Sequence, residues 1–135
     1  MSEKEFNEQT LEYYSDITVP TFITAGIKEV LPQEIIQELF VLCFQRAVEL
    51  KDTDMSTDYL QVFDITSERY QDIGLKYRMK MSQEQPEYVT KHVKGLVGDK
   101  VFNGKVYVIE SWNGTPSHLA NIDDHYITML LPSEY

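Results

Sequence analysis

DYLQVFDI, residues 58–65, has the composition of a β-strand and is apolar on both of its faces. Because successive side chains of a strand point to opposite sides, Leu60 and Val62 would lie on one face, and Tyr59 and Phe63 on the other. A strand of this kind needs a covering layer on each side. The sequence therefore raises the question of what covers the second face.

The neighbouring segments predict one long helix and further strands. Apolar residues at helical spacing indicate a helix over residues 33–50, opened by Leu31-Pro32, where the missing proline N–H would be unpaired anyway. Alternating or β-rich stretches predict strands at 21–27, 73–81, 105–109 and 126–131, and residues 82–104 are irregular, with a short edge strand at 88–93 left open. We therefore expect an α+β fold, with a mainly antiparallel sheet of about five strands and one long helix packed on one face.

The first residues predict a short helix of acidic character. Ser2 and Glu5 have the spacing of a capping box, and this helix would end before Pro20. Carboxylates recur every three or four positions and would form one stripe on it: Glu5, Glu8, Glu12 and Asp16. We divide the chain into an acidic amphipathic extension, residues 1–20, and a single α+β domain, residues 21–135.

The charge is large and unevenly distributed. The chain carries 12 basic and 22 acidic side chains, a net charge of −10, and residues 1–65 hold 4 of the basic and 13 of the acidic ones. Such a charge opposes direct binding to nucleic acid or to an anionic membrane. The absence of a long apolar stretch and the single cysteine, Cys43, indicate a cytoplasmic protein.

One predicted strand face is basic. Lys76, Arg78 and Lys80 alternate with apolar residues, and Lys91 and Lys94 follow nearby. These side chains could grip an anion, but we favour a solvated face, or pairing with acids of the same chain.

Several segments in order resemble domain-of-unknown-function family 960, a bacterial family found in Firmicutes. These are FITAGIKEVLPQEIIQELF, DYLQVFDI, KVYVIES and the terminal YITMLLPSEY. The resemblance spans residues 21–135 and is most specific at Leu31-Pro32, at residues 58–63 and at residues 126–130. It implies a small cytoplasmic bacterial protein, and it implies no catalytic residues.

No catalytic, metal or cofactor pattern stands out. His118 with Asp123-Asp124-His125 has suitable donor atoms but no fixed ligand spacing, and a polar turn that enters a strand is the better interpretation. Cys43 lies among apolar residues of the predicted helix, where a thiol is usually a small buried apolar group. We expect no enzyme, no metal and no cofactor.

The remaining features favour a protein-interaction function. Tyr59, Phe63 and Tyr107 would form an aromatic surface beside the acidic stripe, and aromatic residues are typical interface anchors. In its sharpest form, the carboxylates of residues 1–65 imitate phosphates and cover a basic nucleic-acid-binding surface of another protein, as an anti-defence inhibitor does.

Four further interpretations stay open. The aromatic face and the loop of residues 111–124 could form a pocket for a small effector. The protein could form a homodimer through that face, or its aromatic residues could simply pack under the N-terminal segment. A hydrolase that uses His118 or His125 ranks last.

Overall fold

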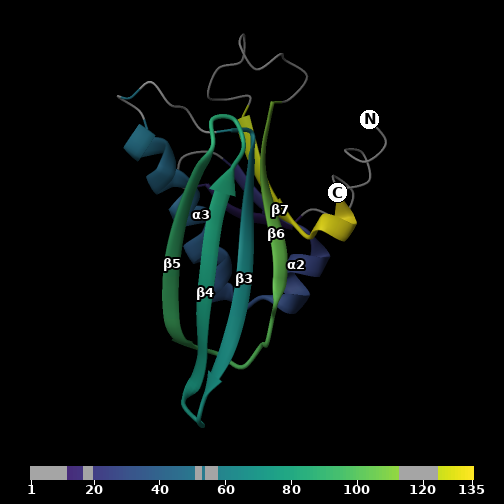
Figure 1. Cartoon of the computed structure of the whole chain (residues 1–135). Helices are drawn as coiled ribbons and strands as arrows, with labels where there is room; N and C mark the ends of the chain where they lie inside the picture. The colour runs from purple at the N-terminus through teal and green to yellow at the C-terminus, as the bar shows by residue number, and fades with distance from the viewer. Residues whose placement is uncertain (1–11, 17–19, 51–52, 54–57, 113–124) are drawn as a thin grey trace.

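The computed structural model describes residues 12–16, 20–50, 53, 58–112 and 125–135 (Figure 1). The strands of the sheet are β1 (Glu12–Asp16), β2 (Pro20–Ile23), β3 (Leu60–Tyr70), β4 (Gly74–Gln83), β5 (Tyr88–Val97), β6 (Gly104–Trp112) and β7 (His125–Leu130). Within these described ranges the helical segments are α2 (Ala25–Val30), α3 (Gln33–Leu50) and the 3-10 turn η3 (Pro132–Glu134).

The strands form one mixed sheet in the order β1-β2-β7-β6-β3-β4-β5. Neighbours pair antiparallel except β2 and β7, which are parallel. The predicted fold class is therefore wrong, because the structure is mostly sheet, with seven strands and a parallel pair. The physical reason is that β7 enters between β6 and the N-terminal β1–β2 hairpin, an insertion over long sequence distance that local periodicity does not encode.

The predicted N-terminal helix is also wrong over the described residues. Glu12–Asp16 is strand β1, which pairs with β2 and has an irregularity in register between Tyr13 and Ser15. Like charges at helical spacing weaken an isolated helix, whereas the edge of β2 offers this segment partners for its backbone N–H and C=O groups. Residues 1–11, which include the capping box, lie outside the described part of the chain.

The strand predicted over residues 21–27 ends early, and a short helix follows it. Thr24 stops β2 and begins α2, because its side-chain oxygen accepts a hydrogen bond from the amide of Ile27 at 3.3 Å. Its own amide donates to the carbonyl of Met129 in β7 at 3.2 Å. A side chain that satisfies a free helix amide is the usual reason for such a boundary.

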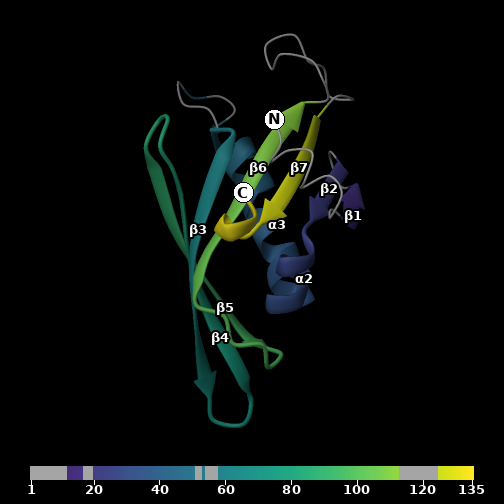
Figure 2. The ribbon, with the colours of Figure 1, turned by 90° about the vertical axis from the view of Figure 1, so that its right-hand side faces the viewer.

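Both helices lie on the same side of the sheet, which we call the inner face (Figure 2). The buried side chains of α3 recur at helical spacing and point into this layer: Ile35, Ile36, Leu39, Phe40, Leu42, Arg46 and Leu50. The strands contribute alternate residues to the same core, among them Tyr77, Met79 and Met81 of β4, each at most 1 % exposed. We call the opposite side the outer face.

The register of β3 reverses the faces expected for Phe63 and for Leu60 and Val62, whereas Tyr59 lies just before the strand. Phe63 is 0 % exposed and belongs to the core beneath α3, paired with Met81 on one side and Val106 on the other. Leu60 and Val62 lie on the outer face instead. Because both faces of this strand are apolar, a period of two residues cannot distinguish them, and tertiary pairing decides.

Candidate functional site

The outer face carries a cluster of tyrosines near the C-terminus. The rings of Tyr107 and Tyr135 meet edge to face, with centroids 5.8 Å apart. Tyr59, just before β3, is 51 % exposed and Tyr135 is 54 % exposed. Tyr135 raises the pKa of Tyr59, first through its charge and then through a side-chain hydrogen bond, so the two phenols are neighbours. We name Tyr59, Tyr107 and Tyr135 the tyrosine cluster.

Glu134 holds the C-terminal residue in this place. Its Oε1 accepts hydrogen bonds from the Thr24 hydroxyl at 2.5 Å and from the amide of Leu131 at 3.0 Å. Its Oε2 accepts from the amide of Gly26 at 3.2 Å, and an added Cβ at Gly26 would come within 2.7 Å of that oxygen. A charged acceptor shared by three donors fixes the η3 turn, and therefore the position of Tyr135.

Two of the three predicted aromatic interface residues thus lie together and the third does not. Tyr59 and Tyr107 are joined by Tyr135, whereas Phe63 is buried on the inner face and presents no surface to a partner. Tyr135 was missed because a terminal residue shows no periodicity. The signal that could have identified it is its place three residues after Pro132, where the chain must turn back towards the sheet.

The predicted acidic stripe is not formed by the described residues. Glu12 and Asp16 are the two ends of strand β1, where residues four apart are separated by about 13 Å instead of one helical turn. Glu5 and Glu8 lie outside the described residues. The spacing argument for one helical row of carboxylates therefore fails at its C-terminal half.

The outer face of β4, β5 and β6 carries most of the positive charge of the described sheet. The cross-strand pairs place basic side chains side by side on this face: Lys76, Arg78 and Lys80 of β4, Lys91 of β5 and Lys105 of β6. The acids on the same face are Asp64 and Glu68 of β3. This patch is cationic in a protein of net charge −10.

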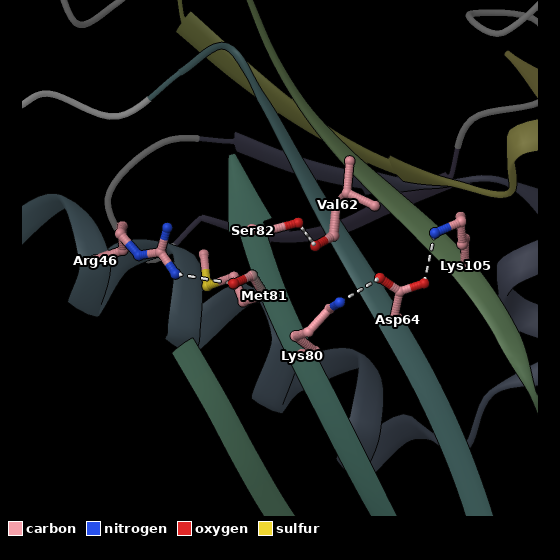
Figure 3. A network of polar contacts seen from close by, with 7 residues as sticks. All are labelled: Arg46, Val62, Asp64, Lys80, Met81, Ser82 and Lys105. Carbon is pink, nitrogen blue, oxygen red and sulfur yellow. Dashed lines mark hydrogen bonds and ion pairs between the residues drawn. The ribbon is translucent and has the colours of Figure 1, made fainter. Parts of the chain in front are cut away.

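Asp64 neutralises part of this patch (Figure 3). Its carboxylate lies 2.6 Å from the Lys105 Nζ and 3.9 Å from the Lys80 Nζ. The hydrogen bond with Asp64, followed by the charge of Asp64, raises the pKa of Lys105. Lys80 and Lys91 stand directly opposite each other on neighbouring strands, a like-charge arrangement that costs stability.

A buried polar network closes the inner face beside α3. Arg46 is 2 % exposed, and its guanidinium lies 4.0 Å from the centre of the Tyr88 ring. It donates to Thr90 Oγ1 at 2.8 Å, to Gln61 Oε1 at 3.4 Å and to the carbonyl of Met81 at 3.4 Å, the last shown in Figure 3. Burial lowers the pKa of Arg46, because taking the cation out of water disfavours its charged form.

The residues weighed for catalysis or metal binding are not assembled into a site by the described structure. Cys43 packs partly buried against the core, and burial raises the pKa of its thiol to about 12, far from a reactive thiolate. His118, Asp123 and Asp124 lie outside the described residues, and His125 begins β7. Within the described ranges, no three His, Cys, Asp or Glu side chains gather where an ion could bind.

The helices of the described chain do not have membrane-spanning character. Neither α2 nor α3 has the length and apolarity needed to cross a bilayer.

The chain belongs to the DUF960 family, described as a staphylococcal protein of unknown function, whose model matches residues 21–134. The resemblance inferred from the sequence is therefore confirmed. None of the curated proteins compared with this chain matches it.

A solved structure has a similar fold. It is the crystal structure of the protein of unknown function from Enterococcus faecalis, with a TM-score of 0.57 and 16% sequence identity. The match covers 92% of this chain and 96% of that one. At this identity the similarity concerns the fold alone.

Proposed function

We propose that this DUF960 protein is a non-enzymatic protein–protein interaction module whose tyrosine cluster is the anchor for a partner protein. The observation that carries the proposal is the exposure of Tyr59 and Tyr135, 51 % and 54 %, with the ring of Tyr107 packed against Tyr135. Tyrosine buries a large area at a low cost in side-chain entropy, and its hydroxyl finds a polar partner.

The rigidity of the cluster supports this role. Glu134 ties η3 to the N-terminus of α2 through two hydrogen bonds and accepts a third from Leu131 at the start of η3, so Tyr135 does not have to be ordered when a partner binds. A surface that is already in its bound arrangement keeps more of its interaction free energy.

The acidic character of the chain adds a preference for the kind of partner. Residues 1–65 carry a net charge of −9, and Glu29, Glu34 and Glu49 expose carboxylates on the helical side. In the sharper form of the proposal, these acids steer the protein, in the cytoplasm, to a basic nucleic-acid-binding surface of another protein, chiefly by raising the association rate.

A small effector fits the tyrosine cluster less well than a protein does. Ligand pockets usually enclose most of the surface of a small molecule. Tyr59 and Tyr135 each leave about half of their surface in water, so they resemble the exposed part of an interface more than the wall of a pocket.

Capture of partners from the native cytoplasm tests the proposal. We expect Tyr59→Ala and Tyr135→Ala each to weaken the capture of the same protein at least tenfold, because central aromatic anchors dominate interface energies. Tyr70→Ala is the matched control, since Tyr70 is 50 % exposed at the far end of β3. Equal loss for all three variants would contradict the proposal, and light scattering that shows a dimer through this cluster would replace the foreign partner by a second copy.

Salt and charge reversal test the sharper form. Glu5→Lys, Glu8→Lys and Glu12→Lys together should lower the association rate, and raised salt should do the same to the unmodified protein. If neither the charge reversal nor raised salt changes the capture, the tyrosine cluster remains the proposed interface and steering by the acidic residues is rejected.

A further inference from the structure

Strand β5 forms one edge of the sheet and has a free side. It pairs with β4 along Tyr88–Val97, and in the strand order of the described chain nothing follows it (Figure 1). Along such an edge, alternate residues direct their N–H and C=O groups away from the sheet, where they are able to pair with another strand. The edge is ten residues long and contains no proline.

The inner-face side chains of β5 hold the strand against the helix. Thr90 accepts the hydrogen bond from Arg46 at 2.8 Å, and Lys94 lies 3.8 Å from the carboxylate of Glu38. Tyr88 donates from its hydroxyl to Glu49 Oε1 at 3.3 Å. Three links from α3 to one strand keep the edge in an extended conformation, ready to accept a partner strand.

The outer-face side chains of β5 alternate in a way that defines a binding pattern. Val89 is 47 % exposed and Val93 is 57 % exposed, with the exposed Lys91 between them. Directly opposed side chains of neighbouring strands lie about 5 Å apart and interact. A strand added beside β5 would therefore gain from two apolar residues flanking one acid.

The charges around Lys91 favour an acid at that position. Lys91 faces Lys80, and the carboxylate of Asp64 lies closer to Lys105 than to Lys80. No acidic side chain of the described residues pairs with Lys91. A carboxylate from outside would pair with Lys91 and so relieve the like-charge arrangement.

Three alternative roles for this edge fit the residues less well. On an edge strand, a lysine often has no role other than to prevent aggregation. That role does not explain why two exposed valines flank Lys91. A second copy paired through β5 would bring no acid to Lys91, since residues 88–97 contain none. Single-stranded nucleic acid would find no aromatic residue on the outer face of β5 on which to stack its bases.

We propose that the free edge of β5 binds an extended segment of a partner protein as an additional strand. The segment carries an aspartate or glutamate opposite Lys91 and apolar residues two positions before and after it, opposite Val89 and Val93. Backbone hydrogen bonds supply the affinity and these three side chains supply the specificity. The site lies on β5, three strands away from β6, which carries Tyr107, and it shares no residue with the tyrosine cluster.

A pair of synthetic peptides tests this site on the full chain. The first alternates valine and threonine around a central glutamate, and the second has a central lysine in its place. By fluorescence anisotropy at low salt, we expect the glutamate peptide to bind about five- to tenfold more tightly, as a favourable cross-strand charge pair replaces an unfavourable one. Lys91→Glu should reverse this preference, whereas Lys100→Glu, which makes the same charge change elsewhere, should keep it.

Amide hydrogen exchange locates the bound peptide. We expect the glutamate peptide to slow exchange at alternate residues of β5, those whose N–H groups point away from β4. Tyr59→Ala and Tyr135→Ala should leave peptide binding unchanged, so failure at this edge and failure of the tyrosine cluster are distinguishable.

The following results would overturn the proposal. They are absence of peptide binding, equal affinity for both peptides, protection that maps outside β5, and a homodimer whose β5 amides are already protected without peptide. Tighter binding of a single-stranded oligonucleotide that depends on Lys91 would also reject a protein partner for this edge.

Discussion

The two faces of the sheet are built from the same strands but are covered to very different extents. On the inner face, Phe63, Met79 and Val106 are at most 1 % exposed beneath α3. On the outer face, Val93 is 57 % exposed and Tyr59 is 51 % exposed. The inner face is therefore where the fold is stabilised, and the outer face offers surface for binding. Five experiments, from the largest expected effect to the smallest, test this difference.

Truncation of one aromatic residue from each side is the most direct test. Phe63→Ala should lower the free energy of unfolding by about 3–5 kcal/mol, because it leaves a cavity in the core. Tyr59→Ala should change it by no more than about 0.5 kcal/mol, because the side chain is half exposed. Urea unfolding measures both, and similar losses would show that the two faces are equally important for stability.

The pKa of the Cys43 thiol tests how well the inner face is shielded from water. Burial raises its pKa from 9.0 to about 12, so the folded state favours the neutral thiol. This contribution to stability is complete below pH 9 and is lost as pH rises towards 12. At pH 8.5, iodoacetamide should modify the native thiol roughly a hundredfold more slowly than the urea-unfolded one. Equal rates would place Cys43 in contact with water.

Arg46 tests the polar corner of the inner face. In Arg46→Met, the new side chain has a similar volume, but the hydrogen-bond donors to Gln61, Met81 and Thr90 are lost. We expect a loss of about 1–3 kcal/mol in unfolding free energy, because buried acceptors remain without partners. A variant as stable as the original would show instead that desolvation of the guanidinium cancels its hydrogen bonds.

Glu134 tests the link between the helical side and the tyrosine cluster. Glu134→Ala removes the acceptor for Thr24, Gly26 and Leu131, and should cost about 1–2 kcal/mol in urea unfolding. As Tyr135 loses its position, the pKa of Tyr59 should fall towards its ordinary value, which an ultraviolet titration detects. Glu87→Ala, an exposed acid in the turn between β4 and β5, is the control and should do neither.

The smallest effect concerns the cationic outer face. Lys91→Glu should stabilise the free protein by about 0.2–1 kcal/mol, because it turns the like-charge pair with Lys80 into an attractive one. The gain should vanish at about 1 M salt. A loss of stability at low salt would mean that Lys91 already has a favourable partner in the folded chain.

Much of the secondary structure was predictable, whereas its assembly was not. The helix after Leu31-Pro32 and the strands around residues 60, 75, 106 and 127 occur close to the positions that periodicity indicates. Spacing of apolar residues is a local property, because it follows from the geometry of one helix or one strand. The β1–β2 hairpin, the parallel β2–β7 pair and the length of β5 were not predicted.

The candidate surfaces show the same division. Tyr59 and Tyr107 were named from the sequence, but their contact runs through Tyr135, whose place depends on Glu134 meeting a helix more than a hundred residues earlier. The basic strand face was visible as alternating lysines and arginine. That Lys91 stands opposite Lys80 on a free edge depends on the strand order.

The sequence by itself determined the amphipathic helix, the alternating strands, the family and the sign and uneven distribution of the charge. Only the tertiary structure decided which face of β3 is buried, which strand is left at the edge and which tyrosines meet. The reason is that a segment apolar on both faces has no local preference between them. Its orientation is set by the pairing of strands far apart in the chain and by the helix that covers one side.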